Sequence, residues 1–305
     1  MEILPIIAKM AVLVLLMLVG YGCAKIGLTG PDFNQKVTPV VLNVLLVGTI
    51  LNSVIGAEEL VSGVVLLQYF AAFIAMFVLS IAAAWLGARL LRRDRDDEGV
   101  LRMLMTFPNN AFVGFPVVAA VFGEQAVFYA AISNIPFNVL LYTLGTAQLR
   151  RGGRGGVEWK RIFTPPLIAT LVAAVLYLAR IPVPSVIGET VSMLAGATIP
   201  MSMLIVGTSL GAIPVRKAFG SLRVYFAAAV RLLVIPLVVW LVLRLVITDP
   251  VMLGIPVLIA ACPSAMIITV LCITYGKDES LASEIIFTST VLSAITMPLL
   301  AWLLF

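Results

Sequence analysis

The chain has 305 residues and a net charge of +5, with 62% hydrophobic and only 11% charged residues. Soluble domains carry roughly 25% charged residues, so this composition, with a mean hydropathy of +1.13, excludes a soluble globular protein. The positive charge lies mainly in loops and indicates membrane topology rather than a nucleic-acid partner, and the lack of histidine excludes histidine-based catalysis, proton relays and metal sites.

Apolar runs long enough to cross a hydrocarbon core of about 30 Å recur along the whole chain. They predict an all-α integral membrane protein with about ten transmembrane helices. The approximate cores of these spans are residues 6–23, 38–55, 62–87, 100–122, 126–148, 163–180, 187–210, 222–247, 251–274 and 282–304. The first run ends in Gly-Tyr-Gly-Cys, which is no small-x-small cleavage pattern, so we expect a span rather than a cleaved signal peptide.

The fourth span is interrupted by prolines and small polar residues. Pro108, Asn109 and Asn110 precede its middle, and Gly114 and Pro116 follow it. A proline removes an amide donor and clashes with the preceding turn, so this segment is not expected to be one unbroken helix. Broken helices survive in hydrocarbon only where protein encloses them or where they line a wet cavity.

The fifth span carries Asn134 and Asn138 one turn apart. Either a hydrogen bond between helices or a place in the lining of a site would explain this pair.

A glycine-rich polar stretch, residues 150–161, divides the chain nearly in half. It predicts a flexible linker between a first half, residues 1–149, and a second half, residues 162–305. Five spans precede the linker and five follow it. Since an odd number of spans reverses the orientation of the second half, the sequence predicts two inverted five-helix repeats.

Arg231 is a charged residue inside the eighth span. An arginine at this depth is a candidate for a functional or coupling charge, but it could equally cap exposed carbonyl groups or reach toward the membrane surface.

The ninth span is interrupted at the position that corresponds to the break in the fourth. Its middle contains Pro263, Ser264 and Thr269. Paired broken helices in the two halves of a chain are the best sequence indicator of a transporter's substrate site. The sequence therefore places the candidate site where these two segments are interrupted.

The broken helices favour binding of an anion. The exposed amides at the N-terminal end of a half-helix carry partial positive charge, which suits a carboxylate. The side-chain amides of Asn109 and Asn110 can donate to an anion, and Ser264 could do the same from the second break. The alternative is that Pro108 and Pro116 only kink the helix and the asparagines cap its fragments.

Cys23, Cys262 and Cys272 lie in apolar surroundings without metal-type pairing, so neither a metal nor a cofactor is expected.

Basic residues give the orientation. They gather in the loops after spans 1, 3, 5, 7 and 9, whereas the opposite loops hold mainly acidic residues. Because positively charged loops stay in the cytoplasm, we expect both termini on the non-cytoplasmic side of the cell membrane.

Four stretches together resemble a known family. FPNNAFVGFPVVAAVFG (107–123) is similar to the fourth span of the auxin efflux carrier family, ATIPMSMLIVGTSLG (197–211) to its seventh and VRLLVIPLV (230–238) to its eighth. Residues 260–304 resemble its last two spans. The short loop at 150–161 is typical of the prokaryotic members, which are carboxylate permeases of the malonate or malate type with a bile-acid-symporter-like architecture.

The resemblance implies a scaffold domain of spans 1, 2, 6 and 7, through which a homodimer can form. It also implies a transport domain of spans 3–5 and 8–10, in which broken helices 4 and 9 cross. Carried over by position, Asn109 becomes the carboxylate-binding residue, and Pro116 and Pro263 become the crossover prolines. The chain has Gly48 where the family often has proline, and this affects the scaffold side of the pocket, which comprises Val47 and Asn52.

The predicted function is a secondary transporter in the lipid bilayer that moves a small organic anion by an elevator-type, alternating-access mechanism. An intramembrane enzyme would need a pair of catalytic residues deep in the membrane-spanning segments, and the sequence offers no such pair. The alternative function is a sodium- or proton-coupled carrier of the related bile-acid symporter fold. The lack of an acidic residue deep in any span argues against it.

Overall fold

The structure is a computed structural model that describes residues 3–55, 62–91, 95–150, 159–213 and 221–304. All regular elements in these ranges are helices, so the predicted all-α class is confirmed for the described part of the chain. Most of the predicted linker falls on residues 151–158, which lie outside the described ranges.

Seven described helical segments are long and apolar enough to cross a membrane, judged by length and composition. They are Ile7–Lys25, Pro31–Asn52, Gly63–Leu90, Ala126–Leu149, Ser185–Ala212, Leu222–Leu243 and Glu279–Leu303. Three shorter apolar helices, Asn110–Phe122, Pro165–Ala179 and Pro250–Ala261, fall on the predicted spans 4, 6 and 9. Helical segments therefore coincide with the predicted spans, whereas the inverted five-plus-five repeat stays a prediction.

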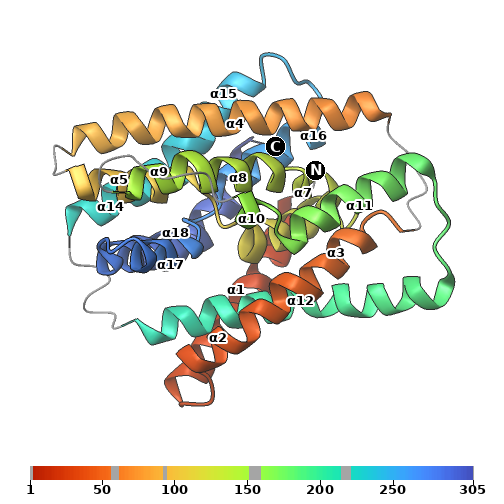
Figure 1. The fold of residues 1–305 in the computed structure, drawn as a ribbon, viewed down its shortest axis with the longest axis horizontal. Helices are drawn as coiled ribbons and strands as arrows, with labels where there is room; N and C mark the ends of the chain where they lie inside the picture. The colour runs from red at the N-terminus through yellow and green to blue at the C-terminus, as the bar shows by residue number, and fades with distance from the viewer. Residues whose placement is uncertain (1–2, 56–61, 92–94, 151–158, 214–220, 305) are drawn as a thin grey trace. The chain divides into compact units, whose positions relative to one another are not determined.

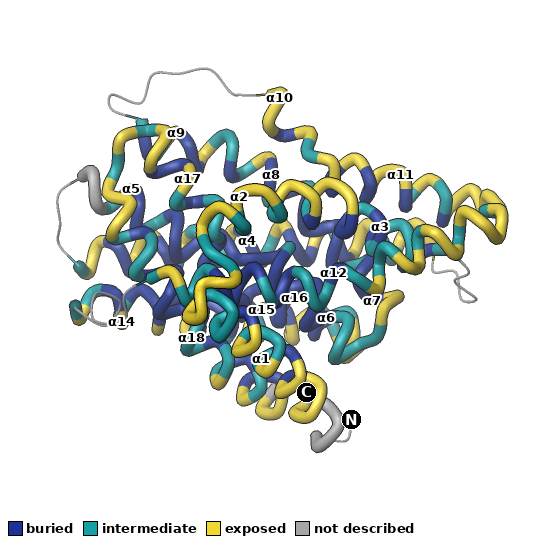
Figure 2. The backbone as a smooth tube through the Cα atoms, turned by 90° about the horizontal axis from the view of Figure 1, so that it is seen from below, coloured by how far each residue is buried: buried dark blue, intermediate teal, exposed yellow. Residues whose placement is uncertain are grey.

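Large apolar side chains are exposed along many of these helices. Figure 2 shows the exposed residues of all types in yellow. Leu15, Val78 and Val175 are each about 60% exposed. Exposing apolar surface to water costs roughly 25 cal/mol per Å², a cost that hydrocarbon removes. This surface fits a protein that is embedded in a bilayer.

The chain divides into two compact units. Unit 1 contains Met1–Ala71, Ala111–Ile135 and Phe163–Ala212, and unit 2 contains Ala72–Asn110, Pro136–Ile162 and Ile213–Phe305. Each unit is thus built from three separate stretches of sequence. The boundaries divide the predicted spans 3, 4 and 5.

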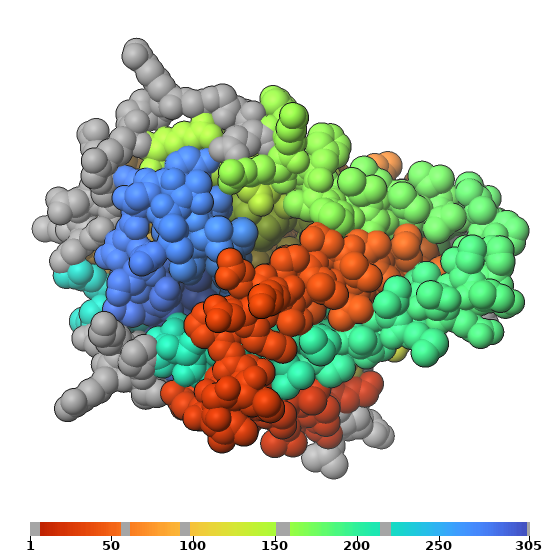
Figure 3. All heavy atoms as spheres, turned by 60° about the horizontal axis from the view of Figure 1, so that its bottom comes forward, coloured from red at the N-terminus to blue at the C-terminus, as the bar shows by residue number. Residues whose placement is uncertain are grey.

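Unit 1 is a layer of packed helices. Its elements are α1 (Ile3–Lys25), α2 (Pro31–Val40), the π-helical turn η1 (Val41–Leu45), α3 (Leu46–Asn52), the start of α4 (Gly63–Leu90), most of the π-helical turn η2 (Asn110–Gly114), α6 (Phe115–Phe122), α7 (Ala126–Ala131), α11 (Pro165–Ala179) and α12 (Ser185–Ala212). The long helix α12 packs against α1, α2 and α3 (Figure 1). Figure 3 shows α3 in orange between α11 and α12 in green.

Glycines allow α1 and α12 to approach closely. A Cβ atom added at Gly207 would lie 2.0 Å from the carbonyl oxygen of Met17, and one added at Gly20 would lie 2.5 Å from that of Leu204. Small residues at such contacts let helix backbones meet in apolar surroundings. These two positions therefore fix the packing of the first and seventh predicted spans.

Unit 2 surrounds the two proline breaks. Its elements are most of α4, α5 (Arg95–Thr106), α8 (Asn134–Leu140), which starts at the unit boundary, the π-helical turn η3 (Leu141–Gly145), α9 (Thr146–Leu149), α10 (Trp159–Ile162), α14 (Leu222–Ala229), the π-helical turn η4 (Val230–Val234), α15 (Ile235–Leu243), α16 (Pro250–Ala261), α17 (Ile267–Thr274) and α18 (Glu279–Leu304). Every residue of α16 from Leu253 to Ala261 is buried, which makes this half-helix the core of the unit.

Two of the π-helical turns lie directly before prolines. Pro116 is the second residue of α6 after η2, and Pro236 is the second residue of α15 after η4. A proline ring clashes with the carbonyl four residues earlier, and one wider turn relieves that clash without ending the helix. Asn110 and Arg231, two of the predicted candidates, lie in these widened turns.

An aromatic cluster supports the first break from within unit 2. Phe107 lies 5.6 Å from Phe137 and 6.2 Å from Phe77, measured between ring centroids. The ring pairs adopt edge-on or tilted geometries, which aromatic rings prefer. Because Phe107 directly precedes Pro108, this cluster fixes the point where the helix stops.

Candidate functional site

Both interrupted segments lose their helical backbone within unit 2. α5 ends at Thr106, and helical backbone resumes at Asn110. α16 ends at Ala261, and α17 begins at Ile267. Each interruption contains one of the predicted prolines.

The two interruptions meet as a short antiparallel bridge. The backbone amide of Asn109 donates to the carbonyl of Pro263 at 2.8 Å. The amide of Ala265 donates to the carbonyl of Phe107 at 3.0 Å. Buried backbone groups must be paired, and here each break supplies the partner that the other lacks.

Ser264 replaces a donor that Pro108 cannot provide. In a continuous helix the carbonyl of Leu104 would accept from the amide four residues later, but that residue is Pro108. The hydroxyl of Ser264 donates to the Leu104 carbonyl instead, at 2.7 Å. The amide of Ser264 donates to the hydroxyl of Ser289 at 3.2 Å, so both polar groups of this fully buried residue are used within the protein.

Arg231 completes the end of α5. The carbonyls of Met105 and Thr106 lose their helical donors, because the amides of Asn109 and Asn110 bond elsewhere. Nη1 of Arg231 donates to both carbonyls, at 3.0 and 3.3 Å. One guanidinium nitrogen thus satisfies the last two carbonyls of this half-helix.

The same side chain also completes the end of α16. Pro263 cannot provide the amide that the carbonyl of Ile259 would accept from in a continuous helix. This oxygen accepts from the amide of Cys262 at 3.2 Å instead, and Nη2 of Arg231 approaches it at 3.5 Å. Nε of Arg231 donates to the carbonyl of Cys262 at 2.9 Å. Arg231 is completely buried. These bonds correspond to the capping of carbonyl groups, one of the alternatives that the sequence left open for this residue.

Asn109 and Asn110 lie beside this bridge. They are only 4% and 3% exposed, so their side chains are enclosed in this conformation. The amide of Asn110 donates to the carbonyl of Pro108 at 3.0 Å, which turns the chain into η2. Both asparagines therefore lie where the second half of the broken segment begins.

The other predicted site residues lie in unit 1. Gly114 is buried at the end of η2, directly before α6. Pro116 and Asn52 line a cavity of about 30 Å³, whereas the half-buried Val47 is not part of its lining. A Cβ atom added at neighbouring Gly48 would lie 3.0 Å from the side chain of Leu194 on α12.

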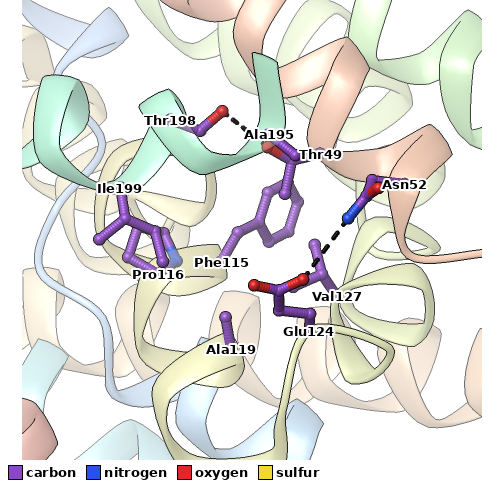
Figure 4. Close-up of a pocket in the computed structure, with 10 residues that line it drawn as sticks. All are labelled: Thr49, Asn52, Phe115, Pro116, Ala119, Glu124, Val127, Ala195, Thr198 and Ile199. Carbon is purple, nitrogen blue, oxygen red and sulfur yellow. Dashed lines mark hydrogen bonds between the residues drawn. The ribbon is translucent and has the colours of Figure 1, made fainter. Parts of the chain in front are cut away.

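The cavity of unit 1 has a mainly apolar lining and two pairs of polar side chains, Thr49 with Thr198 and Asn52 with Glu124 (Figure 4). Its lining comprises Thr49, Asn52, Phe115, Pro116, Ala119, Glu124, Val127, Ala195, Thr198 and Ile199. The amide of Asn52 donates to the exposed carboxylate of Glu124 at 3.4 Å, and the hydroxyls of Thr49 and Thr198 are 2.7 Å apart. The volume is close to that of one water molecule, so the cavity of this conformation is too small for an organic acid.

Sequence reasoning missed three polar residues of this cavity. Thr49 lies three residues before Asn52 on α3, so a polar pair on one helix face was the available signal. In the sequence, Glu124 stands out only as one of the acidic residues in the loops opposite the basic ones. Thr198 comes from α12, and no local pattern links it to the others. In the described part of the chain, no group of three or more Cys, Asp or Glu residues could hold a metal ion.

Comparison with known sequences identifies related chains. A family profile described as membrane transport protein matches residues 5–301. A protein named uncharacterized transporter from Methanothermobacter thermautotrophicus is 30% identical over 296 residues, which is 95% of each chain. A protein of the same description from Methanocaldococcus jannaschii is 24% identical over 303 residues, 96% of this chain and 97% of its own.

Proposed function

Because the chain belongs to the membrane transport protein family, we propose that it is a secondary transporter that moves a small organic anion across the cell membrane. The family match also confirms the resemblance to the auxin efflux carrier family. The observation that carries the proposal is the pairing of the two proline breaks in unit 2, beside two buried asparagines. Backbone of this kind is tolerated at membrane depth where it forms a site.

The proposed ligand is a carboxylate. Each break is followed by the N-terminal end of a helical segment, at Asn110 and at Ile267, and such ends favour anions. Asn109 and Asn110 add side-chain amides, while Pro263 shapes the backbone beside Asn109. Ser264 and Arg231 hold the bridge together through the bonds described above. Both asparagines are buried, so a conformational change has to uncover them before substrate binds.

We propose elevator-type alternating access as the mechanism. In this proposal the chain forms two inverted repeats of five spans, and broken helices 4 and 9 cross at the bridge. Spans 1, 2, 6 and 7 form the scaffold domain, which also mediates a homodimer, and spans 3–5 and 8–10 form the transport domain. Both termini lie outside the cytoplasm, as the distribution of basic loops indicates.

A binding experiment tests the proposed ligand class. Purified protein is screened by thermal shift against acetate, malonate, malate and succinate, and the best acid is compared with its methyl ester. A hydrogen bond to a charged group contributes about 1.5–3 kcal/mol, so the ester should bind about tenfold or more weakly. Equal affinity for acid and ester would contradict an anion site.

A further inference from the structure

Arg231 carries its charge in a completely buried environment. Among the described residues, no carboxylate forms an ion pair or a hydrogen bond with Arg231. Its hydrogen-bond partners are four backbone carbonyls, at 2.9 to 3.5 Å. An unbalanced buried charge would cost several kcal/mol, so these carbonyls have to compensate it.

The carbonyls belong to the ends of two half-helices. Met105 and Thr106 terminate α5, and Ile259 and Cys262 belong to the end of α16. The C-terminal end of a helix carries about half a negative elementary charge. Two such ends together carry about one negative charge, which matches the single positive charge of the guanidinium.

Unwound carbonyls and half-helix C-terminal ends are the groups that bind Na⁺ in cation-coupled secondary transporters. In this chain the same kind of group is already occupied by a side chain. We propose that Arg231 is a built-in cation that takes the place of a coupling Na⁺ at the broken helices. Anion binding and transport at this site then require no Na⁺.

The chemistry of arginine suits this role. A guanidinium stays charged at physiological pH and has five donors in a rigid plane, so it can bond to two helix ends at once. A bound Na⁺ can leave when the protein changes conformation, whereas Arg231 is covalently attached. The two half-helix ends therefore stay neutralised in every transport state.

This inference rests on the proposed transport function, but its first test needs no substrate. The wild-type melting temperature is measured in NaCl, KCl and choline chloride at equal ionic strength. We expect the same value in all three salts. A melting temperature that rises specifically with Na⁺ would show that a Na⁺ site remains and would overturn the proposal.

The second test removes the built-in cation. Arg231→Ala should lower the melting temperature, and millimolar methylguanidinium or Na⁺ should restore much of the loss, whereas choline should not. Arg244→Ala is the matched control, because Arg244 is an exposed arginine at the end of the same span, and its melting temperature should not respond to methylguanidinium. Loss of stability in Arg231→Ala without rescue by either small cation would contradict the proposal.

If Arg231→Ala does not fold, Arg231→Lys takes its place in the test. Lysine keeps the positive charge but donates hydrogen bonds from a single nitrogen. This variant should be less stable than wild type and equally insensitive to Na⁺. A Na⁺-dependent melting temperature in Arg231→Lys would count against the built-in cation. If the cation tests succeed and no carboxylate binds, only the proposed function fails; if carboxylates bind but wild type needs Na⁺, only this inference fails.

Discussion

Asn109 and Ser264 come from the two interruptions that the backbone bridge joins, and we propose that their side chains have different roles. The polar groups of Ser264 are both engaged by the protein backbone and Ser289. Asn109 lies at the start of the half-helix that is proposed to face the substrate. Truncating each side chain therefore separates binding from stability.

Asn109→Ala should weaken carboxylate binding. The change removes a donor and an acceptor but keeps both prolines, so the break itself remains. A lost hydrogen bond to a charged ligand corresponds to about 1.5–3 kcal/mol, or a roughly tenfold to hundredfold rise in Kd. Isothermal titration calorimetry with the best acid from the screen measures this change in Kd. Wild-type affinity together with a lower melting temperature would show that Asn109 only caps the helix.

Ser264→Ala should lower stability and leave affinity unchanged. The substitution removes the donor to the Leu104 carbonyl, which has no helical donor because of Pro108. A buried carbonyl without a partner costs about 1–3 kcal/mol. The expected result is a lower melting temperature with the wild-type Kd. A Kd that rises as much as in Asn109→Ala would place Ser264 in direct contact with the substrate.

Single residues were predictable from the sequence only as candidates. Asn109 and Pro263 were named from the breaks, and the structure places them 2.8 Å apart through backbone atoms. The role of Arg231 could not be derived, because its carbonyl partners lie up to 126 positions away. Only the folded chain brings these groups together.

At the scale of elements, the contact between α1 and α12 depends on glycine. Gly207→Ala would place a Cβ atom 2.0 Å from the Met17 carbonyl, and the rigid backbone cannot move aside easily. We expect the free energy of unfolding to fall by about 1–3 kcal/mol, the usual cost of overpacking, and the melting temperature to fall with it.

Gly196→Ala is the matched control on the same helix. A Cβ atom there meets no atom within 4 Å, and alanine favours helices by about 1 kcal/mol over glycine. This variant should be as stable as wild type or more stable. Equal losses in both variants would show that the close helix contact is not what Gly207 provides.

The helices themselves were largely predictable, because apolar runs and prolines act locally. The breaks in the fourth and ninth segments lie where Pro108 and Pro263 remove backbone donors. The π-helical turns were not predicted. Ordinary helix residues form them, and of the four described turns only η2 and η4 directly precede helices with a proline at the second position, Pro116 and Pro236.

At the scale of the whole molecule, each compact unit combines three stretches of sequence. Composition and the family motifs predicted a multi-pass helical membrane protein, and the long apolar helices support it. The sequence could not predict that unit boundaries would run through spans 3, 4 and 5. Contacts between distant segments determine those boundaries.

The inverted topology predicts opposite sides for two loops. In a variant without native cysteines, Gly153→Cys should react with a membrane-impermeant maleimide only from the cytoplasm. Ile181→Cys, at the far end of the sixth span, should react only from outside. Labelling of both positions from the same side would contradict the five-plus-five arrangement.

Counterflow exchange in proteoliposomes tests the central claim most directly. Vesicles are loaded with the unlabelled acid that binds best, and uptake of the labelled acid is followed in choline chloride. We predict saturable uptake that depends on internal acid and falls strongly in Asn109→Ala. Uptake no faster than in protein-free vesicles for every acid tested, or a non-saturating flux at channel rates, would contradict a carboxylate transporter.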